Sequence, residues 1–259
     1  MRLRVGGVMG WPEQYARVIL PEIDSTNAEG LRRAPEMAGP TWVFAHRQTR
    51  GRGRRGRAWA DPVGNFAASL VLRPAGGPEH AALYSFVASL ALCEACSALT
   101  CEPSRFSLKW PNDVLLDGGK LAGILLESTG SARDGLTLVI GIGVNLAHAP
   151  EGEQLEGGAL RPVALAAQTG LLIPAEAFLT TLEQHFAALD RQFQQAGFAP
   201  IRRAWLQRAA RLGDVITART MRDSFTGTFE TIDDTGNLVL HTAQGRQAIA
   251  AADVFWEGG

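Results

Sequence analysis

Residues 105–128 read RFSLKWPNDVLLDGGKLAGILLES, and this stretch is the most informative part of the chain about its fold. Two apolar runs, Arg105–Trp110 and Gly123–Ser128, predict central β-strands. Turn-forming residues lie between them, so we expect the chain to reverse direction there. Because Lys109 and Lys120 stand at the two ends of the intervening piece, a hairpin would bring both ammonium groups to one pocket.

Strands and helices alternate on both sides of this hairpin. Apolar and β-branched runs predict strands, and apolar residues recurring every three or four positions predict helices. The expected strands are Val18–Ile23, Thr41–Ala45, Phe66–Leu72 and Leu136–Asn145, and the expected helices are Ala28–Ala34, Tyr84–Leu99 and Phe178–Gln195. We expect a capping box of Thr26 and Glu29 to begin the first helix. Pro35 and Gly197 should follow the ends of the first and last helices.

The sequence pattern changes from about Arg211, where short predicted strands follow one another at near-regular spacing. The expected strands are Asp214–Arg219, Gly227–Ile232, Leu238–His241 and Gln247–Ala250. Such spacing is typical of a small β-barrel of roughly fifty residues. The sequence therefore predicts an α+β chain with a mixed domain over residues 1–208 and a small all-β domain over residues 209–259.

Composition excludes several classes of protein. The 259 residues are 46% hydrophobic, which is normal for a globular protein and too high for a disordered one. The net charge of −1 is too low for a protein coated with nucleic acid. We find no run of about 18 apolar residues and no secretory signal, so we expect no membrane span. Without a signal, Cys93, Cys96 and Cys101 predict reduced thiols in the cytoplasm, and no fourth ligand or nearby histidine supports zinc.

Basic residues are distributed unevenly. Of the 25, 23 are arginine, and the segment Arg47–Arg57 carries six of them with no acid. Its glycines match G-x-G-x-x-G, but no helix opens at the third glycine, which excludes the dinucleotide fingerprint. The segment reads either as a flexible loop that closes on an anion or as a nucleic-acid contact. Lys109 and Lys120 are the two lysines of the chain. Either they are present by chance, or they supply compact ammonium groups that arginine cannot replace.

Glycines in two expected strands point to a ligand or a second backbone in close approach. Gly141 and Gly143 fall on one face of a strand that ends at Asn145, and Gly123 interrupts an otherwise apolar strand. A strand face without side chains leaves a smooth floor on which a flat group can lie.

Five segments together resemble biotin protein ligases, in the order seen in that family. They are Asp24-Ser25-Thr26-Asn27, Gly51–Arg57, Lys109-Trp110-Pro111-Asn112-Asp113, Lys120-Leu121-Ala122-Gly123-Ile124 and Gly141-Ile142-Gly143-Val144-Asn145. The resemblance covers roughly residues 18–256. It implies a mixed-sheet catalytic domain similar to class II aminoacyl-tRNA synthetases and lipoate ligases, followed by an SH3-like domain.

The resemblance also implies a reaction and the residues that carry it. Biotin and ATP would give biotinyl-5′-AMP and pyrophosphate, and the biotinyl group would then pass to a lysine of a carrier domain. The implied biotin-binding residues are Ser25, Thr26, Asn27, Gln48, Arg52, Gly53, Arg54, Lys120 and Gly123, of which Lys120 and Arg54 are also catalytic. The implied adenylate-binding residues are Arg54, Arg57, Trp59, Lys109, Asn112, Gly141, Gly143 and Asn145, and the stretch after Asn145 would also help to hold the adenylate. Mg²⁺ would come with the ATP phosphates, and Asp113 is the one protein carboxylate considered as a metal ligand.

The implied partner is the biotin carboxyl carrier domain of acetyl-CoA carboxylase or a related carboxylase. Family members that also act as repressors carry a winged helix, and only 23 residues precede Asp24, so we expect no specific DNA binding. A homodimer is compatible with the resemblance. Two other functions stay open: a lipoate–protein ligase of the same superfamily, and a nucleic-acid-binding module built on the arginine loop.

Overall fold

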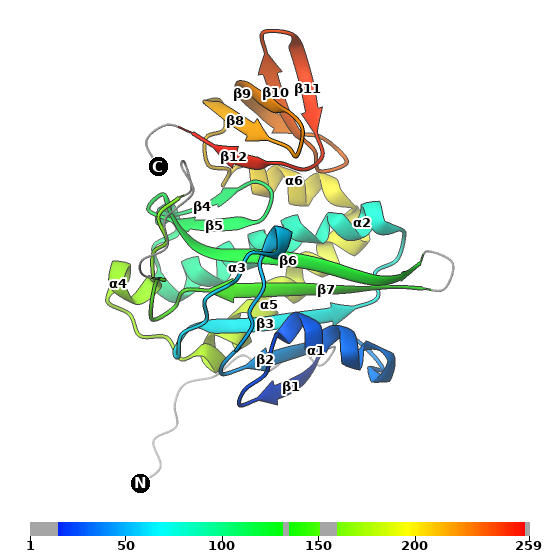
Figure 1. The fold of residues 1–259 in the computed structure, drawn as a ribbon, viewed down its shortest axis with the longest axis vertical. Helices are drawn as coiled ribbons and strands as arrows, with labels where there is room; N and C mark the ends of the chain where they lie inside the picture. The colour runs from blue at the N-terminus through cyan, green and yellow to red at the C-terminus, as the bar shows by residue number, and fades with distance from the viewer. Residues whose placement is uncertain (1–14, 132–134, 151–159, 257–259) are drawn as a thin grey trace.

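The computed structural model of the chain describes residues 15–131, 135–150 and 160–256. Its larger part is built on a seven-stranded mixed sheet (Figure 1). The strands are β1 (Ala16–Leu20), β2 (Thr41–Ala45), β3 (Phe66–Leu72), β4 (Phe106–Lys109), β5 (Asp113–Leu116), β6 (Gly119–Ser131) and β7 (Gly135–Val144). Their order is β1-β2-β3-β7-β6-β5-β4, with β1 and β2 parallel and the other neighbours antiparallel. The expected mixed sheet is confirmed.

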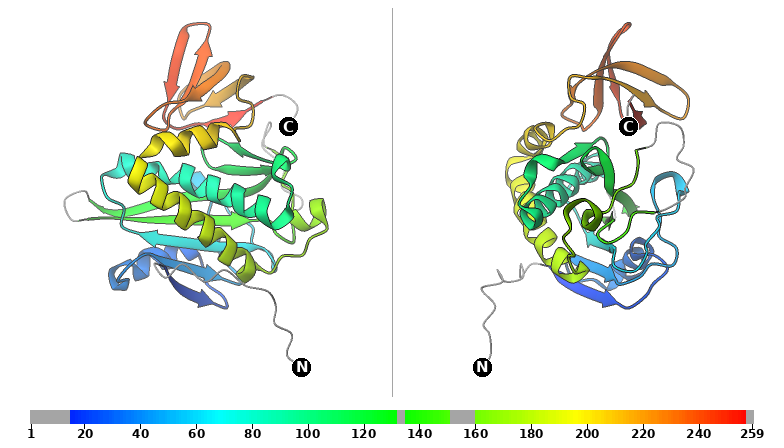
Figure 2. Two further views of the ribbon diagram at one scale, coloured as in Figure 1. Left: turned by 180° about the vertical axis from the view of Figure 1, so that it is seen from behind. Right: turned by 90° about the vertical axis from the view of Figure 1, so that its left-hand side faces the viewer.

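Helices cover the two faces of this sheet unequally. Figure 2 shows α3 and α5 packed across one face, with α6 against both helices and β9 (Ser224–Ile232), while α1 lies on the other face beside β2 and β3. The helices are α1 (Thr26–Arg33), α2 (Pro78–Ala82), α3 (Tyr84–Thr100), α4 (Leu165–Thr169), α5 (Ala175–Ala196) and α6 (Phe198–Leu206), with single 3₁₀ turns at Ala34–Glu36, Arg54–Gly56 and Pro103–Arg105. The face on the side of α1 is therefore only partly covered, and the ligand site described below lies there.

The stretch Pro78–Thr100, which includes α3, is long and apolar enough to cross a membrane by composition, with a mean hydropathy of 1.6. The expectation that no such stretch exists was therefore too simple. However, 72% of this apolar window is buried inside the protein, because α3 lies between the sheet and α5. A helix that is apolar on every side is typical of such a buried position.

Of the cysteines, Cys93 and Cys96 are buried in this helix, Cys101 is exposed, and all three are free thiols.

The C-terminal domain is a five-stranded antiparallel sheet with the SH3-like fold, at the top of Figure 1. Its strands are β8 (Val215–Arg219), β9 (Ser224–Ile232), β10 (Leu238–Thr242), β11 (Gly245–Ile249) and β12 (Asp253–Phe255), in the order β11-β10-β9-β8-β12. The first four correspond to predicted strands. The three-residue β12 was not predicted, and it adds Asp253 to the edge of the sheet that faces the larger domain.

One continuous hydrophobic core links the two sheets. The indole of Trp110, which is 3% exposed, donates a hydrogen bond of 3.1 Å to the carbonyl of Gly236 in the turn between β9 and β10. Phe86 of α3 packs against the same glycine. The predicted boundary at residues 208 and 209 falls between the end of α6 and the start of β8.

The hairpin region differs from its prediction in two respects. The strand expected at Arg105–Trp110 is β4, which forms the edge of the sheet and not its centre. The piece between the predicted strands contains a further strand, β5, so the chain reverses twice, once on each side of it. Four residues between two turns are too short a run to give a periodic signal.

Candidate active site

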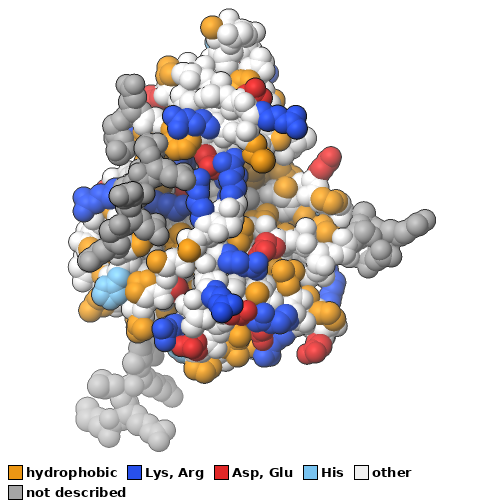
Figure 3. Space-filling model, in the orientation of Figure 1, with side chains coloured by type: hydrophobic (Ala, Val, Ile, Leu, Met, Phe, Trp, Pro, Cys, Tyr) orange, Lys and Arg blue, Asp and Glu red, His pale blue; other side chains and the backbone are white. Residues whose placement is uncertain are grey.

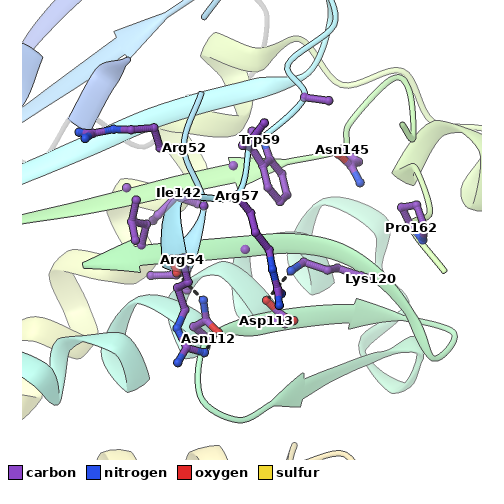
Figure 4. A pocket seen from close by; sticks show the side chains of 18 of the residues that line it. Arg52, Arg54, Arg57, Trp59, Asn112, Asp113, Lys120, Ile142, Asn145 and Pro162 are labelled. Atoms are coloured by element: carbon purple, nitrogen blue, oxygen red, sulfur yellow. Dashed lines mark hydrogen bonds and ion pairs between the residues drawn. The ribbon is translucent and has the colours of Figure 1, made fainter. Parts of the chain in front are cut away.

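A cavity of about 530 Å³ opens on the sheet face that α1 only partly covers. It lies between the start of α1, the arginine loop, the β5–β6 hairpin and β12, and Figure 4 shows its side chains from close by. Five lining residues are basic and two are acidic among those that the structure describes. In Figure 3, Lys and Arg side chains gather on this face below the C-terminal sheet.

Every residue to which the sequence assigned a role lines this one cavity. They are Ser25, Thr26, Asn27, Gln48, Arg52, Gly53, Arg54, Arg57, Trp59, Lys109, Asn112, Asp113, Lys120, Gly123, Gly141, Gly143 and Asn145. The chain therefore brings together segments that are more than a hundred residues apart in sequence. Their proximity is a structural fact, and their individual roles stay predictions.

The start of α1 supplies hydroxyl and amide groups. Ser25 is the N-cap, and its Oγ accepts a hydrogen bond of 3.4 Å from the backbone N–H of Ala28. Thr26 donates both its N–H and its hydroxyl to Oε1 of Gln48, at 2.8 and 3.0 Å. The predicted capping box is wrong, because the N-cap is Ser25, one residue before the expected Thr26, and Glu29 pairs with arginines of the last turn.

Lys120 reaches the cavity through an irregularity in β6. Residues three apart in a regular strand face opposite sides of the sheet, yet Lys120 and Gly123 both line the cavity. The register shifts between the pairs Val114–Ala122 and Leu115–Lys120, so Leu121 is an extra residue opposite β5. The bulge thereby turns the lysine toward the site.

Both lysines lie beside Asp113. Nζ of Lys120 is 2.9 Å from Oδ1 of Asp113, a pair seen in Figure 4, and Lys109 is the direct cross-strand partner of Asp113. The carboxylate is 13% exposed. Burial lowers the pKa of Lys109, and the charges of Lys120 and Arg54 act in the same direction. The predicted meeting of the two lysines is confirmed, although two hairpins and not one produce it.

The glycines form a floor that is already covered. Gly123 and Gly143 are direct neighbours on β6 and β7, and the indole of Trp59 lies over both. A Cβ atom at Gly143 would collide with that indole, and one at Gly123 would approach it to 3.2 Å. Asn27 fills the corresponding space above Gly141. The close approach expected at these glycines is confirmed, and the groups that make it belong to the chain itself.

Two buried groups at the cavity wall have no hydrogen-bond partner among the described residues. Asn145 is 2% exposed and donates its Nδ2 to the carbonyl of Val163 at 3.1 Å, but its Oδ1 accepts no hydrogen bond there. The indole N–H of Trp59 is likewise unpaired. Since buried polar groups are normally paired, Oδ1 of Asn145 is a candidate acceptor for a ligand's donor, whereas Nε1 of Trp59 lies against Gly143.

Comparison with known proteins identifies the fold and the family. Residues 19–145 match the biotin/lipoate A/B protein ligase family model, and residues 212–256 match that of the biotin protein ligase C-terminal domain. A biotin–[acetyl-CoA-carboxylase] ligase of Paracoccus denitrificans is 54% identical over 93% of this chain and 100% of its own length. The chain belongs to the biotin protein ligase family.

Other members of this family agree with the assignment. The bifunctional ligase/repressor BirA of Bacillus spizizenii is 31% identical over 95% of this chain and 74% of its own length. A solved structure of the Aquifex aeolicus biotin protein ligase in complex with biotin and ATP superposes with a TM-score of 0.79. It is 26% identical and covers 92% of this chain and 98% of that one. The match to the C-terminal biotin ligase domain favours a biotin ligase over a lipoate ligase.

The arginine loop of this ligase is tied to carboxylates and amides of the protein. Arg52 lies 3.1 Å from Glu127 of β6, and the same carboxylate oxygen accepts a hydrogen bond of 2.8 Å from Asn27. Arg54 donates to Oδ1 of Asn112 at 3.3 Å. Asn112 lines the cavity and holds the Arg54 guanidinium at its wall, whereas Glu127 ties Arg52 to β6. Both arginines are engaged by the protein itself, which disfavours the nucleic-acid-contact interpretation of the loop.

The sequence reasoning missed the three wall residues that the C-terminal domain supplies to the ligase site. They are Asp253, Val254 and Phe255 of β12. Nothing local in the sequence marks them, because their relevance depends on where the C-terminal sheet docks. Glu127, which holds Arg52 and Asn27, was also missed. Of the stretch after Asn145 that we expected to hold the adenylate, Pro150, Leu160 and Pro162 line the cavity, and residues 151–159 lie outside the described residues.

The described residues contain no group of three or more histidine, cysteine, aspartate or glutamate side chains that could hold a metal. Asp113 is the carboxylate nearest to that role, and Lys120 already pairs with it. The donor set thus fits an Mg²⁺ ion that enters with a nucleotide better than an ion held by the ligase itself.

Proposed function

We propose that this chain activates biotin with ATP as biotinyl-5′-AMP and transfers the biotinyl group to a lysine of a carboxylase carrier domain. The observation that carries the proposal is the division of one cavity into two chemical halves. Neutral hydroxyl and amide groups at the start of α1 face a cluster of cations on β4, β6 and the arginine loop. Biotin has the same two halves, a neutral ureido ring and a carboxylate.

The neutral half suits the ureido ring, which carries two N–H donors and one carbonyl acceptor. Ser25, Thr26, Asn27 and Gln48 offer hydroxyl and amide groups that both donate and accept. Backbone groups of the loop from Arg52 to Arg54 would complete this half. Because no full charge stands on the ring, charged partners are not needed around it.

The cationic half suits the activation step. A carboxylate oxygen of biotin attacks the α-phosphorus of ATP, the bond to the β-phosphate breaks, and pyrophosphate leaves. Two anions must approach each other, so preorganised cations lower the barrier by offsetting their repulsion. Lys120, held in place by Asp113, can follow the negative charge as it moves from carboxylate to phosphate. Arg54 acts from the other side of the same space.

The nucleotide end would be held by the remaining cavity residues. Asn112 and Asn145 supply amide groups, and Oδ1 of Asn145 is a buried acceptor ready for a donor. Arg57 and Lys109 supply positive charge for the phosphates, and the indole of Trp59, which covers Gly143, supplies a flat apolar surface. Mg²⁺ would be bound mainly by the phosphates.

In the transfer step the ε-amine of a carrier lysine attacks the acyl carbon, the bond to AMP breaks, and the amine loses a proton. A carboxylase carrier is supported by the name of the Paracoccus relative, a biotin–[acetyl-CoA-carboxylase] ligase. A homodimer is supported by the open edge of β6, which continues to Ser131 although β5 pairs with it only from Gly119 to Gly123. The absence of specific DNA binding stays a prediction.

An ATP–pyrophosphate exchange assay tests the proposal. Purified protein is incubated with radioactive pyrophosphate and ATP in the presence of biotin, of lipoate, or of neither acid. We expect exchange only with biotin. Exchange only with lipoate would replace the proposal by the lipoate ligase alternative, and exchange with neither would overturn it.

A further inference from the structure

Three arginines of the loop converge on one carboxylate of the C-terminal domain. Oδ2 of Asp253 lies 2.7 Å from Arg55 and 3.2 Å from Arg57, and its Oδ1 lies 3.8 Å from Arg54. Asp253 is the first residue of β12, and its side chain is 18% exposed. The loop that lies over the glycine floor is thus tied to a separate domain.

Counted over the residues that the structure describes, this arrangement leaves positive charge in excess. One carboxylate, with one negative charge and two oxygens, serves three guanidinium groups, while Lys109 and Lys120 stand in the same cavity with Asp113. A triphosphate carries more negative charge and more acceptor oxygens than a carboxylate, and it forms bidentate contacts with arginine. Arg54 and Arg57 line the cavity, so phosphates that enter it meet the same guanidinium groups that Asp253 holds.

We infer that Asp253 is a positioning residue that occupies the place of a phosphate. Its carboxylate holds Arg54, Arg55 and Arg57 until the phosphates of ATP replace it. The inference rests on the proposed function, which makes ATP the nucleotide. A contact that exists only in the nucleotide-free protein stabilises that form alone and therefore weakens nucleotide binding. The C-terminal domain thereby sets the affinity of the site for ATP.

A purely structural role for Asp253 gives a different expectation. If the carboxylate only fastens the two domains together, it contacts the arginines with and without nucleotide, and its removal does not strengthen nucleotide binding. The chain offers a matched control for this role. Arg202 of α6 pairs with Asp234 in the turn between β9 and β10, which is also an arginine–aspartate pair between domains but lies outside the cavity.

The experiment measures the Kd of α,β-methylene-ATP by calorimetry in the presence of saturating biotin, since this analogue cannot form the adenylate. The proteins are wild type, Asp253→Asn, Arg55→Asn and Asp234→Asn. Arg55 pairs with Asp253 but does not line the cavity, and asparagine tolerates its φ of 56°. We expect the Kd to fall about three- to tenfold in Asp253→Asn and Arg55→Asn, as suits the loss of a partly exposed ion pair, and to stay unchanged in Asp234→Asn.

Hydrogen exchange over residues 46–60 provides a second readout. In the nucleotide-free state we expect faster exchange in Asp253→Asn than in wild type, and equal exchange once the analogue is bound. An unchanged or higher Kd in folded Asp253→Asn would overturn the inference. If that variant does not fold, Arg55→Asn decides in the same way. A wild-type protein without biotin-dependent pyrophosphate exchange would refute the proposed function instead, and the Kd comparison would still test Asp253.

Discussion

The ammonium group of Lys120 lies 2.9 Å from the carboxylate of Asp113, and one extra residue in β6 allows this contact. Without the bulge at Leu121, regular alternation would turn Lys120 away from the face that carries Gly123. The position of the lysine thus depends on strand register as well as on its identity. A flexible four-carbon side chain held at its tip by a buried carboxylate is suited to meet a shifting charge.

Lys120→Ala should abolish adenylate formation while leaving the fold intact. Removing a charge-assisted contact at the reacting centre costs a few kcal/mol of transition-state stabilisation, so we expect exchange to fall by at least about a hundredfold. Biotin-dependent pyrophosphate exchange measures the loss, and circular dichroism checks the fold. Near-normal exchange by a folded variant would show that Lys120 is not catalytic.

Arg54→Gly should make the enzyme release its adenylate early. Arg54 lines the cavity and contacts Asn112, so its loss opens the space over the intermediate and raises the dissociation rate more than it slows the chemistry. We expect biotin to appear on lysines of bystander proteins such as serum albumin. Arg50→Gly is the matched control, because Arg50 belongs to the same loop but does not line the cavity. Labelling confined to the carrier in Arg54→Gly would argue against a covering role.

Gly143→Ala should displace Trp59 from the floor. The added methyl group collides with the indole, and overpacking of this kind costs about 1–3 kcal/mol. We therefore expect the Kd for biotinyl-5′-AMP to rise about tenfold, since 1.4 kcal/mol corresponds to a factor of ten. Titration with a non-hydrolysable adenylate analogue measures the change. Gly39→Ala serves as the control, because no atom lies within 4 Å of a Cβ placed there. Equal affinity in both variants would contradict the steric argument.

Stability should fall with rising pH because of Glu183. This carboxyl group is 0% exposed, and burial raises its pKa to about 8 in spite of the nearby Arg17. The folded state therefore holds the proton more tightly than the unfolded chain, so the stabilisation is complete below about pH 4.5 and is lost as the pH rises through about 8. Glu183→Gln removes this titration. We expect the free energy of unfolding of wild type to decline relative to the variant by about 1 kcal/mol or more between pH 5 and 8.

Urea unfolding at several pH values provides the measurement for Glu183. The two curves of unfolding free energy against pH should diverge within this window and run parallel above it. Parallel curves throughout would mean that Glu183 keeps an ordinary pKa in the folded state.

Much of the site could be predicted because its residues can be recognised from the sequence immediately around them and from the composition of the chain. Gly141 and Gly143 sit two apart in an apolar strand, so they face the same side whatever the rest of the fold. Lys109 and Lys120 stand out in a chain that otherwise uses arginine. These four residues can be identified without knowledge of the tertiary structure, and all four line the cavity.

The remaining features depend on contacts that a linear pattern does not contain. Asp253 matters because β12 docks beside the arginine loop, almost two hundred positions away in sequence. Trp59 covers the floor because the loop folds back on itself, with its backbone N–H donating to the carbonyl of Gly51 at 2.9 Å. The failed capping box has a local cause, since Ser25 and Thr26 are both competent caps and only the backbone decides between them.

The hydrogen bond from Trp110 to Gly236 has a consequence for how the molecule melts. Trp110 stands in the same five-residue motif as Asn112 and Asp113, so the segment that shapes the ligand site is also the joint between the sheets. With a hydrophobic core running through that joint, neither half has a complete interior of its own. Heat or urea should therefore unfold the whole chain in a single cooperative transition. A destabilising substitution in the core of the C-terminal strands would then lower the population of folded, ligand-competent molecules as directly as one beside the cavity.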